Sequence, residues 1–79
     1  MRRIREIAVE INATWSKIGK GVNYAARPYL DAMGDLDSIN DNYATVSGRS
    51  VVLYFLSNAS TFRGPDAKRL KAELKGLLA

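Results

Sequence analysis

The sequence predicts an all-α fold, a small compact bundle of about four helices packed around a central apolar helix at residues 47–59. Apolar residues recur at three- and four-residue steps in residues 4–18 and 65–78, which is the period of one helix face. Glycine and proline separate the apolar segments. The apolar run 51–56 would also suit a strand, but no partner strand for it is evident elsewhere in the chain, so we expect a helix there.

The first helix carries the strongest periodic signal in the chain. Gly19 and Gly21 follow it, and glycine commonly ends a helix because it relaxes the backbone. Glu6 and Glu10 lie one turn apart on its polar side, where nearby arginines favour solvated ion pairs over acid–base chemistry. The predicted inward face consists of Ile4, Ile7, Ala8, Ile11, Trp15 and Ile18.

The middle of the chain is predicted to form short elements. Pro28 suits a first helical turn because it has no N–H to donate, and Gly34 closes this brief second helix. Residues 35–42, DLDSINDN, mix turn formers with Leu36 and Ile39, so we expect a turn or one more short helical piece anchored in the core. This acidic loop lacks the glycine and the bidentate glutamate of an EF-hand, although it remains able to dock a basic partner.

The third helix is expected to begin after Ser47, a suitable N-cap, and to run to about Ala59. Its apolar side chains cover most of the circumference, which is typical of a helix in the middle of a bundle. Four of its residues are expected to be fully buried against the first and last helices: Val52, Leu53, Phe55 and Leu56. The last helix is predicted over residues 65–78, with Asp66 at its positive end. Its predicted inward face consists of Ala67, Leu70, Leu74, Leu77 and Leu78.

Composition argues against most enzyme chemistry. The 79 residues, expected to form a single helical domain over 1–79, include no cysteine and no histidine. Most metal sites, thiol chemistry and proton transfer near neutral pH therefore lose their usual side chains, so we expect no enzyme activity, no metal and no cofactor. The run 51–56 is far shorter than the roughly 20 residues that cross a bilayer. Glu6 and Glu10 interrupt the signal-like N-terminus, so a cytoplasmic location without a membrane is expected.

Charge is unevenly distributed along the chain, with net values of +4, −4 and +4 over residues 1–28, 29–45 and 46–79. Lys68, Lys71 and Lys75 share one flank of the last helix, and Arg69 lies on the other flank. These four residues form either a surface for weak, non-specific nucleic-acid binding or for an acidic partner, or the solvated side of a core helix. A helix-turn-helix motif is not favoured, because the first turns of this helix offer few side chains for base readout.

Two smaller features are also candidate contact sites. Phe62 and Arg63 form a recognition tip, or alternatively Phe62 closes the end of the core while Arg63 neutralises helix-terminal carbonyls. Small residues on outer helix faces give a helix-docking surface, suited to a partner or to a homodimer, or are exposed by chance. These small residues are Val9 and Ala13 on the first helix and Ala72 and Gly76 on the last.

Residues 49–78, RSVVLYFLSNASTFRGPDAKRLKAELKGLL, together with PYLDAM at 28–33, resemble small helical proteins encoded by bacteriophages and prophages. The resemblance covers most of the chain and implies a compact accessory protein in the host cytoplasm that binds a host or phage component. Our leading hypothesis, based on the missing catalytic side chains and the separated charged surfaces, is a non-enzymatic protein that acts through protein–protein interaction with a partner, or with itself. The alternative is a small basic nucleic-acid-binding module that uses the lysine face of the last helix.

Overall fold

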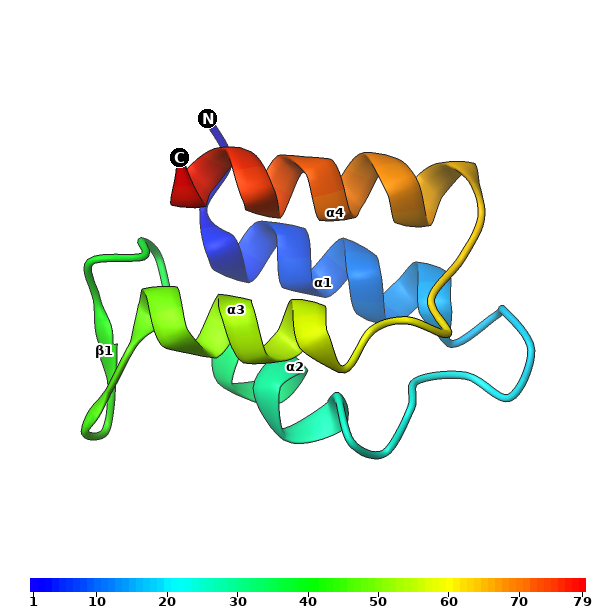
Figure 1. Ribbon diagram of the computed structural model, residues 1–79, viewed down its shortest axis with the longest axis horizontal. Coiled ribbons are helices and arrows are strands. Elements are labelled where there is room, and N and C mark those ends of the chain that lie inside the picture. The colour runs from blue at the N-terminus through cyan, green and yellow to red at the C-terminus, as the bar shows by residue number, and fades with distance from the viewer.

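A computed structural model describes residues 1–79 and contains four α-helices and one short antiparallel hairpin (Figure 1). The elements are α1 (Ile4–Trp15), α2 (Arg27–Met33), β1 (Asn42–Tyr43), β2 (Val46–Ser47), α3 (Gly48–Ser57) and α4 (Pro65–Leu78). The prediction of four helices is confirmed, but the prediction of a purely α-helical bundle is wrong because of the hairpin. In it, Tyr43 pairs with Val46 across a tight turn in which Ala44 adopts a positive φ of 56°.

The α1–α2 and α3–α4 connections lie at the same end of the bundle (Figure 1). Helices α1 and α3 run in the same direction, and α4 runs antiparallel to both. Helix α1 contacts α4 and α2, and α3 contacts α2 and α4. We call the end that holds residues 16–26 and 58–64 the loop end. The hairpin and both chain termini lie toward the other end.

One hydrophobic core is shared by all four helices. The predicted inward faces of α1 and α4 are confirmed, although Ile18, Leu77 and Leu78 are only partly buried. The Trp15 ring stacks on Phe62, with centroids 4.9 Å apart, and meets Phe55 edge-on at 6.1 Å. The fully buried apolar side chains at the centre are Ile4, Ile7, Ile11, Trp15, Met33, Leu36, Val52, Phe55, Phe62, Leu70 and Leu74.

Helix α3 is not central, which corrects the sequence-based expectation. Val52 and Phe55 are fully buried as predicted, but Leu53 is 47% exposed and Leu56 is only partly buried. The other helices cover α3 on one side only, since it packs on α2 and α4 and leaves its outer face to solvent. Although α3 carries apolar side chains on most of its circumference, the other helices do not enclose it, and some of these side chains are exposed.

The connections also show why the helices begin and end where they do. Helix α1 ends at Trp15, earlier than predicted, and Gly19 and Gly21 adopt positive φ values of 53° and 83° in the turns that follow. The Ser47 side chain accepts a hydrogen bond from the Ser50 N–H at 3.1 Å, which confirms it as the N-cap of α3. No helix has the length and apolar character needed to span a membrane.

Candidate interaction surface

The largest cluster of exposed aromatic side chains lies where α2, the hairpin and α3 meet. Tyr29 and Tyr54 face each other from α2 and α3, with ring centroids 5.5 Å apart. Tyr54 and Tyr43 are 52% and 42% exposed, and Val46 is also exposed. We call this hollow the tyrosine groove. Its lining residues are Pro28, Tyr29, Ala32, Tyr43, Val46, Val51 and Tyr54.

The local sequence explains how three elements supply this groove. Pro28 begins α2, and Tyr29 follows it on the side that faces α3. The hairpin register pairs Tyr43 directly with Val46, and directly paired residues project to the same face of a sheet. Tyr54 of α3 contacts Tyr29 of α2 and still keeps about half of its surface open to solvent. The groove therefore rests on two helices that contribute to the core and on a hairpin that contacts α3.

No charged residue lines the tyrosine groove. Tyrosine gives a large, rigid contact area with a polar hydroxyl at its edge, and it is enriched in protein–protein interfaces and among their energetic hot spots. The lining therefore combines apolar side chains with the rings and hydroxyl groups of three tyrosines.

The sequence patterns alone do not single out Tyr43 or Tyr54. One signal for the hairpin is present in residues 42–47, NYATVS, where the polar–apolar order before the turn is mirrored after it. A second signal is that Leu53 and Tyr54 lie on one side of α3, opposite Val52 and Phe55.

The predicted lysine flank of α4 is not a continuous basic row. Lys68 and Lys75 are exposed, but Lys71 bends back so that its Nζ donates to the Phe62 carbonyl oxygen at 2.7 Å. This ammonium also lies 5.7 Å from the centroid of the Phe62 ring. Desolvation lowers the pKa of Lys71, and the neighbouring charges of Lys75 and Arg63 lower it further. The structure therefore leaves only two of the three lysines fully presented to solvent.

Arg69, the other basic residue predicted for this surface, is held in an ion-pair network. Its Nη2 lies 2.5 Å from Glu10 Oε2 and 3.4 Å from Asp66 Oδ1. Arg2 bridges the same Glu10, at 2.7 Å, and Glu73 on α4, at 2.5 Å. Hydrogen bonds from Arg69 and then Arg2 hold the pKa of Glu10 below its usual value, and a hydrogen bond from Arg2 lowers the pKa of Glu73. These residues join α1 to α4.

The prediction that Phe62 is part of an exposed recognition tip is wrong. Phe62 is fully buried and stacks on Trp15, so the alternative interpretation, in which it closes the end of the core, is confirmed. An aromatic ring gains free energy when it leaves water and packs on another ring, and here Trp15 supplies that partner. Arg63 is exposed, and its Nε donates to the Ser60 carbonyl oxygen at 3.2 Å.

The small residues predicted for helix docking are on outer faces. Val9 and Ala13 are exposed on α1, as are Ala72 and Gly76 on α4. Docking of another helix against either face stays a prediction. In the acidic loop, Asp37 pairs with Arg5 at 2.7 Å, and no group of three or more acidic side chains is placed to hold a metal ion.

Comparison with known proteins does not connect these surfaces to a protein family. The chain matches no family model, and no curated protein or solved structure is significantly similar to it.

Proposed function

We propose that this chain is a non-enzymatic accessory protein, of the kind that bacteriophages encode, and that it binds a partner protein through the tyrosine groove. The observation that supports the proposal is that partly exposed Tyr43 and Tyr54, with Tyr29 between them and the core, surround an apolar hollow. The resemblance of residues 49–78 and 28–33 to small phage proteins agrees with an accessory role in the host cytoplasm.

The expected occupant is an apolar segment of the partner. The groove has no charged lining residue, so a charged side chain placed in it would lose water without gaining an ion pair. Apolar and aromatic side chains would instead displace water from the tyrosine rings and from Val46. Because core packing holds α2 and α3 in place, little ordering of these two sides of the groove is required on binding, which favours affinity.

The most direct test compares three baits in affinity capture from nuclease-treated host lysate: the wild type, Tyr54→Ala and Tyr24→Ala. Tyr24 is the matched control, because it is 89% exposed and lies outside the groove. We expect the wild type and Tyr24→Ala to retain a protein that Tyr54→Ala loses, since truncating an interface hot spot costs about 2 kcal/mol or more. Retention of the same proteins by all three baits would contradict the proposal.

Self-association through the same groove is the second form of the proposal. Exposed tyrosine, leucine and valine side chains on a 79-residue chain suit a homodimer. Sedimentation velocity at micromolar concentration should then show a dimer that Tyr54→Ala converts to a monomer. A wild-type chain that stays monomeric at a hundred-fold higher concentration rules out the homodimer and leaves a different protein as the partner.

A further inference from the structure

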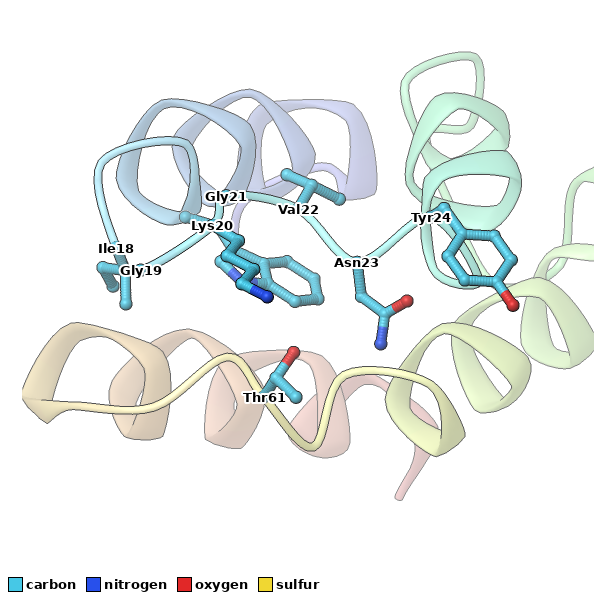
Figure 2. A pocket seen from close by; sticks show the side chains of 9 residues that line it. Ile18, Gly19, Lys20, Gly21, Val22, Asn23, Tyr24 and Thr61 are labelled. Atoms are coloured by element: carbon cyan, nitrogen blue, oxygen red, sulfur yellow. The ribbon is translucent and has the colours of Figure 1, made fainter.

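A second hollow lies at the loop end, between the residues that follow α1 and the connection from α3 to α4 (Figure 2). Trp15 is one of its lining residues, and Thr61 faces the hollow from the opposite segment. The side chains of Lys20, Asn23 and Thr61 are directed into the space between the two segments, and Tyr24 stands at one edge. We call this hollow the loop-end cleft.

The polar side chains of the cleft are suited to an anionic ligand. Asn23 uses its Oδ1 to accept the Ala25 N–H at 2.9 Å, which leaves its amide N–H groups as donors. The Thr61 hydroxyl points toward the loop that carries Lys20 (Figure 2). Together these groups present an ammonium, an amide and a hydroxyl to one small space, and all three can donate to phosphate oxygens.

Three cations that belong to no ion pair line either this cleft or the hollow that begins at Phe62. Six ion pairs form in the chain, and none of them includes Lys20, Arg63 or Lys68. Arg63 and Lys68 line a neighbouring hollow that begins at Phe62, the residue directly after Thr61. The one acidic residue at the start of α4, Asp66, already contacts Arg69. The loop end therefore carries excess positive charge across two adjoining hollows.

Helix macrodipoles do not account for these positions. The dipole effect falls off within the last turn of a helix, whereas Lys20 lies five residues beyond the end of α1. Lys68 lies in the first turn of α4, where the N–H dipoles disfavour a cation. An external anion would stabilise both residues.

We propose that the loop end binds single-stranded nucleic acid. Lys20, Arg63 and Lys68 neutralise successive phosphates, and the Tyr24 ring, 89% exposed, stacks with an unpaired base. A single strand fits better than a duplex because the cations line narrow hollows, one between two connecting segments and one at the start of α4, and because a base must be unpaired to stack on a side chain. This surface differs from the α4 flank in using Lys20 and Tyr24 and in excluding Lys75.

Fluorescence anisotropy with a labelled twelve-nucleotide oligothymidine measures this binding directly. Neutralising about three phosphates of a single strand gives a log–log salt slope of about −2.1, so affinity should fall about 20-fold between about 50 and 200 mM salt. Lys20→Gln should move the slope to about −1.4, and Lys20→Arg should restore it. Tyr24→Ala should weaken binding at every salt concentration while leaving the slope unchanged.

Two matched controls separate this site from general basicity. Lys75→Gln removes one positive charge, as Lys20→Gln does, but from a residue that lines neither hollow. Tyr54→Ala removes a tyrosine from the tyrosine groove and not from the loop-end cleft. Neither variant should change oligothymidine affinity, and circular dichroism should show that all variants remain folded.

Three outcomes would overturn the proposal. The first is unchanged anisotropy up to about 100 μM protein, the second is equal losses for Lys20→Gln and Lys75→Gln, and the third is tighter binding to a duplex than to the single strand. Co-sedimentation with phosphatidylserine vesicles in the absence of oligothymidine binding would equally overturn it, and would identify a lipid surface as the anion.

Discussion

Replacing Phe62 with alanine tests whether the connection between α3 and α4 is part of the core. The ring is fully buried and stacks on Trp15 at 4.9 Å, so its removal leaves a cavity at the loop end. A buried Phe→Ala change costs about 3–5 kcal/mol. The whole domain is expected to have a stability of only about 4–12 kcal/mol, from about 0.05–0.15 kcal/mol per residue. The variant should therefore lose at least about a quarter of the stability of the domain.

Urea denaturation followed by circular dichroism measures this effect. With a slope of about 1 kcal/mol/M for a chain this small, the midpoint should fall by about 3 M or more. Phe62→Leu keeps most of the volume and should cost less than about 1.5 kcal/mol. Leu53→Ala, on the exposed side of α3, should cost less than about 1 kcal/mol. A loss below about 1 kcal/mol for Phe62→Ala would refute its placement in the core.

Two further predictions concern the ion pairs and the start of α3. Because arginines lower the folded-state pKa of Glu10 and Glu73, their stabilisation is present above about pH 4.3 and is lost as the pH falls through the lower folded values. Glu10→Gln should therefore flatten the fall of Tm between about pH 5 and pH 2, and an unchanged profile would contradict the network. A Cβ at Gly48 would lie 2.7 Å from the Ser38 carbonyl oxygen, so Gly48→Ala should cost about 1–3 kcal/mol in urea titration. Gly76→Ala, where nothing lies within 4 Å, should be neutral or stabilising, and equal effects at both sites would argue against this packing.

Helix positions were predictable from the sequence because their signals are local. Ser47 as N-cap and Pro65 at the start of α4 depend only on neighbouring backbone groups, and both are confirmed. The hairpin was missed because each strand has two residues and its turn is Ala44–Thr45, without the glycine or asparagine that usually marks such turns. The prediction that Leu53 is buried was wrong. Periodicity shows which residues share a helix face, but it cannot show whether a chain this short has enough other helices to cover every face.

The candidate surfaces depended more on tertiary structure. Helical spacing correctly puts Lys71 on the same flank of α4 as Lys68. It cannot show that the long side chain of Lys71 bends back to the Phe62 carbonyl oxygen, because that contact depends on where the preceding connection lies. Pairing of Arg69 with Glu10 likewise joins residues that are far apart in the sequence. The tyrosine groove brings together three separate segments, so no single stretch of sequence shows it.

Hydroxyl-radical footprinting of the tyrosines, with and without the captured partner, tests the role of the tyrosine groove most directly. Tyr43, Tyr54 and Tyr24 are all exposed in the free protein and should all react. The partner should protect Tyr43 and Tyr54 and leave Tyr24 as reactive as before. Protection of Tyr24 with unchanged reactivity at Tyr43 and Tyr54 would contradict the assignment of the groove as the interaction surface.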